Sequence, residues 1–152
     1  MIYKEIVKIL RDQDAAFVLL LCHGSADADA ICSAYAFQGL LKRLMPEIVV
    51  EIGAPQGINK PAKKLLEEMP ITVNMKPNIE SADVIFLLDT NSIEQLNEVS
   101  DRLKKSPAPL IVIDHHSPNP DTAKTCKLCI IDEEAAATCE IIYQLFEEAK
   151  LK

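Results

Sequence analysis

The stretch Ala-Phe-Val-Leu-Leu-Leu-Cys at residues 16–22, followed by His23, Asp27 and Asp29, decides the fold of this chain. A short apolar run without alternating polar residues is typical of a strand that is buried on both faces of a parallel sheet. In an open α/β sheet, ligands bind at the carboxyl ends of the parallel strands. The stretch therefore predicts a central strand and, directly after it, one side of a binding site.

The same pattern recurs three more times along the chain. One apolar run ends in Asp114, His115 and His116, another ends in Asp89, and a third ends in Asp132. Because the carboxyl ends of parallel strands meet at one edge of a sheet, we expect a single cluster of imidazoles and carboxylates there. The natural occupant of such a cluster is a pair of divalent metal ions.

Helical patterns separate the apolar runs. We expect strands at 15–22, 48–52, 84–88, 110–113 and 128–131 with a brief edge strand at 71–73, and helices at 1–14, 27–44, 60–68, about 93–105 and 135–150. This alternation predicts the α/β class, as a three-layer α/β/α fold with a mainly parallel, doubly wound, Rossmann-like sheet of about five strands. Residues 117–125, with Pro118 and Pro120, are expected to form a loop beside the site.

The bulk composition narrows the class of protein. A chain of 152 residues with 49% hydrophobic and 26% charged residues is typical of one ordinary globular domain. The apolar run at 15–22 is too short to span a membrane, so we expect no membrane association. A net charge of −7 argues against stable binding of duplex nucleic acid. Five cysteines without framework spacing favour a reducing, cytoplasmic setting.

Two local features are expected to have no catalytic role. Cys126 and Cys129 have C-x-x-C spacing but lack a second pair, and we expect a strand to point them to opposite faces. This disfavours a redox or zinc function. Glu133 and Glu134 are expected to begin the last helix, where negative charge suits the helix dipole.

The spacing of the acidic residues suits two cations rather than one. Asp27 and Asp29 are two residues apart at a helix start, so their carboxylates can diverge towards different ions. Asp89, alone at the end of a central strand, is placed to bridge both ions. His23 would bind beside Asp27, while His115 and Asp132 would complete the second site. Two ions about 3.5 to 4 Å apart can deprotonate a bridging water and hold the oxygens of a phosphoryl group.

On these residues the chain resembles the N-terminal domain of the DHH phosphoesterases. That family includes RecJ-type exonucleases, nanoRNase-type oligoribonucleases, cyclic-dinucleotide phosphodiesterases and, more distantly, family II inorganic pyrophosphatases. The resemblance covers about residues 15–146 and rests on four motifs in the family order. They are His-Gly-Ser-Ala-Asp-Ala-Asp-Ala-Ile-Cys-Ser at 23–33, Leu-Leu-Asp-Thr at 87–90, Asp-His-His at 114–116, and Ile-Asp at 131–132 before the helix that carries Thr138 and Glu140.

The resemblance implies a role for each motif residue. It implies one metal held by His23, Asp27 and Asp89, and a second held by Asp29, Asp89, His115 and Asp132. It makes His116 and Asp114 the catalytic residues beside the metals: His116 would face the phosphate, and Asp114 would orient a histidine and fix its tautomer. The implied cofactor is Mn²⁺, two ions per chain, although zinc or cobalt would also suit such mixed ligands.

The chain departs from the family pattern in three places. Ala26 stands where proline is common and Cys32 where glycine is common. The Gly-Gly-Gly-His segment of the family's second, DHHA1-type, substrate-binding domain has no counterpart. We therefore expect residues 1–152 to be a DHH catalytic domain alone, either a fragment or a stand-alone unit. Its expected partners are a homodimer mate or a separate C-terminal domain.

Three functions remain open at this point. The leading hypothesis is a metal-dependent phosphoesterase that hydrolyses phosphodiesters of short single-stranded oligonucleotides or small nucleotides through a metal-bridged hydroxide. The first alternative is a pyrophosphate or polyphosphate hydrolase. The second is a regulatory module that binds metal or nucleotide but turns over little.

Overall fold

A six-stranded parallel sheet forms the centre of the computed structural model, which describes all residues from Met1 to Lys152. Its strands are β1 (Phe17–Cys22), β2 (Val49–Gly53), β3 (Val73–Asn74), β4 (Val84–Leu88), β5 (Leu110–Asp114) and β6 (Leu128–Ile131). They lie in the order β3-β2-β1-β4-β5-β6, and every neighbouring pair is parallel. The predicted α/β class and doubly wound sheet are confirmed, with the brief edge strand present as a sixth strand.

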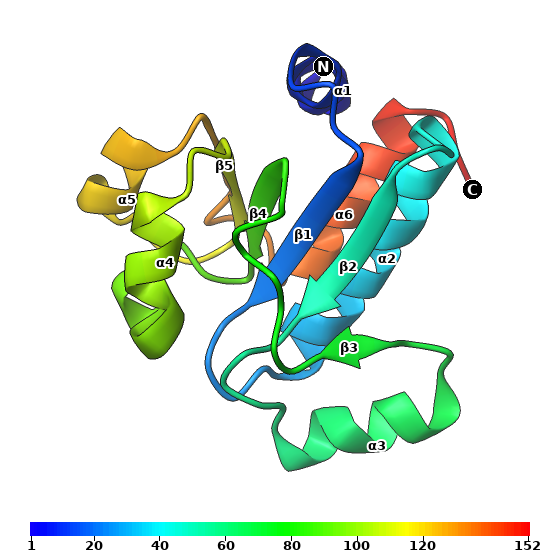
Figure 1. Ribbon diagram of the computed structural model, residues 1–152. Coiled ribbons are helices and arrows are strands. Elements are labelled where there is room, and N and C mark those ends of the chain that lie inside the picture. Colours follow the sequence, from blue (N-terminus) through cyan, green and yellow to red (C-terminus); the bar gives the residue numbers. More distant parts are fainter.

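Helices cover both faces of this sheet (Figure 1). The helical elements are α1 (Ile2–Asp12), α2 (Ala28–Leu44), α3 (Lys60–Glu68), η1 (Glu94–Val99), α4 (Ser100–Lys105), α5 (Pro120–Thr125) and α6 (Thr138–Glu148). Helices α1, α2 and α6 share one apolar core with the sheet, and η1 with α4 share a second one. None of the helices is long and apolar enough to cross a membrane.

Strand β1 belongs to both cores because successive side chains of a strand point to opposite faces. Val18 and Leu20 lie in the core under α1, α2 and α6, whereas Leu19 and Leu21 lie in the core under η1 and α4. All four side chains are fully buried. This two-sided burial explains why the stretch reads as a continuous apolar run, and it fixes β1 as the central strand.

The polar segment at 93–105 is not the single helix that its pattern predicts. Asn97 has a φ of 45° and interrupts the helix, which leaves the 3₁₀ turn η1 before the short helix α4. Asparagine is among the non-glycine residues that adopt positive φ most readily. Leu96 and Leu103, on the two sides of the interruption, lie in the same apolar core.

The segment expected as a loop at 117–125 contains the helix α5. The side chain of Asn119 accepts hydrogen bonds from the N–H groups of Asp121 and Thr122, and Pro120 occupies the first turn. An asparagine N-cap followed directly by proline is a strong helix start. The two prolines therefore mark the beginning of a short helix, and the loop prediction was wrong over this part.

The last helix begins at Thr138, three residues later than expected. Asp132 organises a turn there: its backbone carbonyl accepts from the N–H of Ala135, and its carboxylate accepts from the N–H of Glu134. Glu133 and Glu134 consequently lie in this turn, and the expectation that they begin the helix was wrong. Local side-chain to backbone bonds of aspartate commonly compete with helix formation in this way.

Cys126 and Cys129 form a disulfide, with their Cα atoms 6.3 Å apart. The expectation that they point to opposite faces assumed that one strand contains both residues. In the structure β6 begins at Leu128, and Cys126 is the C-cap of α5. The chain therefore bends between the two cysteines, which brings their sulfur atoms together.

Two glycines, one in a strand and one in a helix, provide a matched test of how tightly the sheet and its helices are packed. A Cβ atom on Gly53 in β2 would lie 2.8 Å from Cβ of Pro77, whereas a Cβ atom on Gly39 in α2 would meet nothing within 4 Å. We expect Gly53→Ala to lower the free energy of unfolding by about 1–3 kcal/mol through overpacking. Gly39→Ala should raise it by about 0.5–1 kcal/mol through helix propensity. Urea unfolding measures both changes, and a shift in the same direction for both variants would contradict this reading.

Candidate metal centre

The predicted site residues gather where the strand order reverses. His23 follows β1, Asp89 follows β4, and Asp114 ends β5 with His115 directly after it. Strand β1 pairs with β2 on one side and β4 on the other, so the connections run outwards in both directions from this point. Such a switch point at the carboxyl edge of a parallel sheet leaves a crevice between neighbouring loops.

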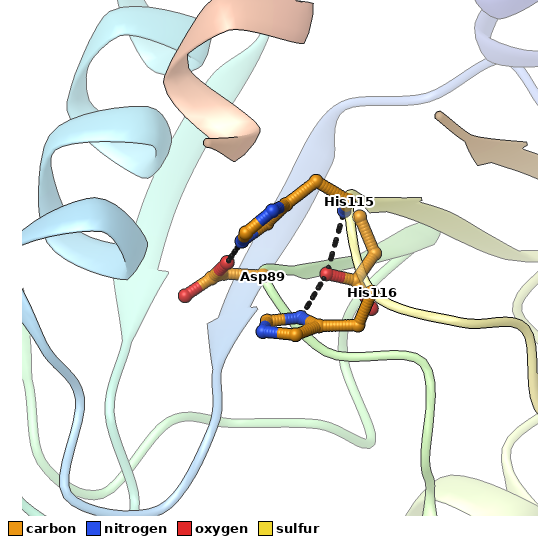
Figure 2. Close-up of side chains that lie close together, drawn as sticks. Asp89, His115 and His116 are labelled. Atoms are coloured by element: carbon orange, nitrogen blue, oxygen red, sulfur yellow. Dashed lines mark hydrogen bonds and ion pairs between the residues drawn. The ribbon is translucent and has the colours of Figure 1, made fainter. Parts of the chain in front are cut away.

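Asp89 lies at the centre of the cluster and is almost fully buried, with 3% of its surface exposed. Its Oδ2 lies 3.3 Å from Nε2 of His23, and its Oδ1 lies 3.3 Å from Nε2 of His115. Figure 2 shows the ring of His115 turned towards this carboxylate. The hydroxyl of Thr138 donates to Oδ1 at 3.0 Å. Each oxygen of Asp89 therefore faces a different imidazole.

The backbone of Asp89 contributes to this placement. Its φ is 63°, in the left-handed region that few residues other than glycine adopt. Its N–H still donates to the carbonyl of Ile113, so the residue remains attached to β5 while the chain turns away. Strained backbone of this kind persists where surrounding contacts enforce it, and it is common at functional sites.

His23 and Asp27 form one wall of the cluster. Asp27 is the N-cap of α2: its Oδ1 accepts from the N–H of Ala30 at 2.9 Å. The same oxygen lies 3.6 Å from Nε2 of His23. Nδ1 of His23 lies 2.8 Å from the carbonyl oxygen of Gly24, which leaves Nε2 directed at the carboxylates. A histidine held through one ring nitrogen by a carbonyl presents the other nitrogen as a metal ligand.

Asp29 joins two helices. Its carboxylate accepts from the N–H of Thr138 at 2.9 Å and from the N–H of Cys139 at 3.0 Å. The N-cap residue of α6, Ala137, supplies no side-chain bond of its own. Asp29 in α2 therefore caps α6 from a distance of 109 residues along the chain. Its Oδ2 also lies 3.5 Å from Nε2 of His115, so it faces the cluster as well.

Asp114 is fully buried and positions His116. Its Oδ1 accepts from the N–H of His115 at 2.8 Å and lies 2.7 Å from Nδ1 of His116. Because the carboxylate oxygen accepts, the proton of the His116 ring sits on Nδ1 and its Nε2 is left free. The side chain of His116 is 57% exposed, in contrast to His115 at 22%. Of the two histidines, His116 is thus the one open to solvent and to a substrate.

The charges of the cluster shift the pKa values of its members. The hydrogen bond with Asp89 raises the pKa of His23 to about 9. Burial raises the pKa of Asp89 above its ordinary value. For Asp29 burial acts to raise the pKa, but the hydrogen bonds from the N–H groups of Thr138 and Cys139 outweigh it and lower the pKa. A proton on His23 balances part of the charge of the carboxylates, and a metal ion that binds His23 must displace it.

The donor atoms fit divalent cations. Two groups of side chains place their ligand atoms within 4.8 Å of one another: His23, Asp27 and Asp89 form one, and Asp89, Asp114, His115 and His116 form the other. Ligand bonds of about 2.1 Å at right angles put neighbouring donors about 3 Å apart. The 3.3 Å separations around Asp89 are close to that value. Mixed imidazole and carboxylate donors suit manganese and several other divalent ions.

Asp132 stands apart from the other predicted ligands. It follows β6 at the same edge of the sheet, but its carboxylate accepts from the N–H of Glu134 at 3.0 Å, and it pairs with no histidine, unlike Asp27, Asp29 and Asp89. The five other predicted ligands, His23, Asp27, Asp29, Asp89 and His115, all lie within 3.6 Å of at least one other member.

A cavity of about 730 Å³ opens over the cluster and is lined by 14 residues, all polar or charged apart from two prolines. No lysine or arginine lines it, so Asp27, Asp89, Asp114 and Asp121 give it a negative character. Its wall includes Asn91, a residue that the sequence analysis did not identify. Asn91 stands two residues after the strand-terminal Asp89, and that position is the only local signal that could have pointed to it.

Comparison with known proteins gives a family match over most of the chain. Residues 17–152 match the model of the DHH family, N-terminal domain. Over 134 residues the chain is 36% identical to an uncharacterised protein of Methanocaldococcus jannaschii, a match that covers 88% of this chain and 40% of that protein. It is 34% identical over 134 residues to a probable manganese-dependent inorganic pyrophosphatase of Bacillus licheniformis, a match that covers 86% of this chain and 41% of that protein.

A solved structure has the same fold. An exopolyphosphatase-related protein from Bacteroides fragilis superposes with a TM-score of 0.72 at 23% identity, over 95% of this chain and 42% of that chain. The present chain thus spans about two fifths of the length of each of these proteins.

The roles of Asp89 and His116 are separable by metal analysis. We expect Asp89→Ala and Asp89→Asn to abolish turnover and weaken Mn²⁺ binding, because the two oxygens of Asp89 face the imidazoles of His23 and His115. Asn tolerates the positive φ of this position, so Asp89→Asn separates charge from backbone strain. His116→Ala should lower turnover about 10²–10⁴-fold, as for loss of a general acid, and leave Mn²⁺ content nearly intact. Equal loss of Mn²⁺ in the His116 and Asp89 variants would refute this division of roles.

The capping role of Asp29 is testable without metal. In the presence of a chelator we expect Asp29→Ala to lower the free energy of unfolding by about 1–2 kcal/mol, as the loss of an N-cap does. Glu133→Ala is the matched control, because it removes an exposed negative charge nearby without removing a cap. Chemical denaturation of both variants decides the matter: an Asp29 variant as stable as the Glu133 variant would show that α6 does not depend on this carboxylate.

Proposed function

The chain belongs to the DHH family, and from that premise we propose that it is a divalent-metal-dependent phosphohydrolase whose centre is Asp89. One observation carries the proposal: the two oxygens of a buried carboxylate each face a different imidazole, at 3.3 Å. Such a carboxylate could hold two cations, each of which one of the two imidazoles could also bind. The manganese-dependent pyrophosphatase among its relatives supports the choice of cation.

We assign the ligands from the geometry and the family pattern together. His23, Asp27 and Asp89 would hold one cation, and Asp29, Asp89 and His115 the other, with Asp132 joining the second after it releases the N–H of Glu134. Bound divalent cations supply positive charge for the phosphoryl oxygens and lower the pKa of water, which makes a nucleophile available near neutral pH.

His116 would act on the leaving group. Its Nδ1 is held by Asp114, so its free Nε2 can carry a proton towards the cavity. Asp114, fully buried, holds the imidazole in one tautomer and stabilises its charged form. Burial acts to lower the pKa of His116, but the hydrogen bond with Asp114 outweighs it and raises the pKa above its ordinary value, which suits a proton donor.

For the substrate we favour a phosphoanhydride, such as pyrophosphate or polyphosphate. No phenylalanine, tyrosine or tryptophan lines the cavity, so its only rings on which a nucleobase could stack are the imidazoles of the site itself. The negative lining without lysine or arginine means that cations must balance the charge of the phosphate. The name of the Bacillus licheniformis relative points to the same substrate class.

Phosphodiesters of short oligonucleotides or small nucleotides are the second candidate. The cavity of about 730 Å³ is within the range of sites for drug-sized ligands and is much larger than pyrophosphate requires. Recognition of a base would then depend on groups outside this cavity, from a second domain or a second copy of the chain. Without such groups, binding energy from remote parts of the substrate cannot be used to raise turnover.

A substrate panel with Mn²⁺ tests the proposal. We expect the chain to release phosphate from pyrophosphate or polyphosphate, to act weakly on activated phosphodiesters, and to discriminate poorly among dinucleotides and cyclic dinucleotides. A chelator should abolish every activity, and Asp89→Asn, purified in parallel, should be inactive and so exclude a contaminant. Preferential cleavage of oligonucleotides would favour the second candidate. Tight Mn²⁺ binding with no turnover of any substrate would contradict both candidates and support a regulatory module.

A further inference from the structure

The side chain of Asn91 lies at the junction of the cavity wall and the strand ends. It is 7% exposed, stands just after β4, and lines the cavity. Its Nδ2 donates to Oδ2 of Asp114 at 2.6 Å and to the carbonyl oxygen of Ser117 at 3.1 Å. Its Oδ1 accepts from the N–H of Asn119 at 2.6 Å. One amide thus contacts three residues that lie 23 to 28 positions further along the chain.

These partners fix the orientation of the amide. Asp114 Oδ2 and the Ser117 carbonyl can only accept, and the Asn119 N–H can only donate. Both Nδ2 protons and an Oδ1 lone pair are therefore used, and reversal of the amide would break all three bonds. Among side chains of this size, only asparagine offers two donors and an acceptor in one plane. Aspartate would lose both donors, and leucine would lose every bond.

The bond to Asp114 completes the support of His116. Oδ1 of Asp114 holds Nδ1 of His116 and the N–H of His115, and Oδ2 is held by Asn91. With both oxygens engaged, the buried carboxylate cannot rotate about its own axis without breaking bonds. The orientation of the His116 ring therefore depends on Asn91, although the two side chains share no hydrogen bond.

The side-chain amide of Asn91 also holds one wall of the cavity, through a hydrogen bond from Asn119. Asn119 donates its N–H to Asn91 and uses its own side chain to cap α5. Residues 117–121 form one side of the cavity. Asn91, just after β4, thus supports His116 through Asp114 and holds the cavity wall through Asn119.

We propose that Asn91 is a positioning residue that acts on turnover through Asp114 and His116. The proposal rests on the phosphohydrolase function given above and on the role of His116 within it. The hydrogen bonds of Asn91 go to Asp114, Ser117 and Asn119, none of which is an assigned ligand, so its loss should leave the cations in place. Partners of this kind are typically associated with 10- to 100-fold effects on activity.

Kinetics of Asn91 variants give the first test. Asn91→Ala should lower kcat about 10- to 100-fold with less than a threefold change in Mn²⁺ affinity, measured by titration calorimetry. Asn91→Asp should lower kcat further, because it keeps the shape but places a second carboxylate against Asp114. Asn91→Ser is the second variant in case Asn91→Ala does not fold. Asn59→Ala is the matched control: it removes the asparagine that caps α3, outside the cavity, and should leave kcat unchanged.

A double-mutant cycle with His116→Ala separates positioning from a general structural effect. If Asn91 acts through His116, Asn91→Ala should lower kcat in the native background and change it less than twofold in the His116→Ala background. Equal fold losses in the two backgrounds would overturn the proposal, because a general disturbance of the fold does not depend on His116.

A measurement without turnover keeps this inference separate from the proposed function. The chain has three histidines, so the imidazole resonances of the metal-free protein are readily assigned by nitrogen-15 NMR. The hydrogen-bonded Nδ1 proton of His116 should be visible in the native chain and in Asn59→Ala. It should be lost or shifted in Asn91→Ala and Asn91→Ser. An unchanged His116 signal in the Asn91 variants would overturn the inference even if the native chain hydrolysed phosphate, and a changed signal would support it even if no substrate were turned over.

Discussion

The burial of one carboxylate constrains the rest of this structure. Asp89 is 3% exposed at the end of a central strand, and removing an ionised carboxylate from water costs several kcal/mol unless it is paired and hydrogen-bonded. Its partners come from three different elements: His23 after β1, His115 after β5, and Thr138 at the start of α6. The fold can satisfy Asp89 only when these elements meet, so the packing that forms the sheet also forms the site.

The helix layer is tied to the site by a second carboxylate. Asp29 caps α6 from within α2, and the two helices pack on the same apolar core. A change at Asp29 is therefore also a change at the start of α6. This coupling distinguishes Asp29 from Asp27, which caps its own helix and whose structural bond is local.

The cavity over the site is acidic, and bound cations would explain how such a cavity could still accept a phosphate. A cavity that binds phosphate usually presents lysine or arginine, yet here every titratable lining residue is an aspartate or a histidine. Hydrogen bonding to Asp89 raises the pKa of His23 to about 9. Without cations, the proton that His23 therefore holds compensates part of the negative charge of the carboxylates. Divalent cations would replace that proton and add positive charge beside the carboxylates, where the oxygens of a phosphate could then bind. The negative lining is therefore compatible with a phosphohydrolase.

The sequence by itself determined the parallel sheet, its central strand and the edge at which the polar residues gather, because apolar runs and the residues that end them are local patterns. Strands at 84–88 and 128–131 were predictable to the residue for this reason. Only the tertiary structure decided that Asp29 caps α6, that Asn91 holds Asp114, that Asp132 turns towards Glu134, and that Cys126 meets Cys129 across a bend. The first two contacts join residues 109 and 23 positions apart, and the other two depend on where a helix or strand begins. Neither a partner so distant in the chain nor the start of an element is specified by the few residues around it, because both are fixed by packing against the rest of the molecule.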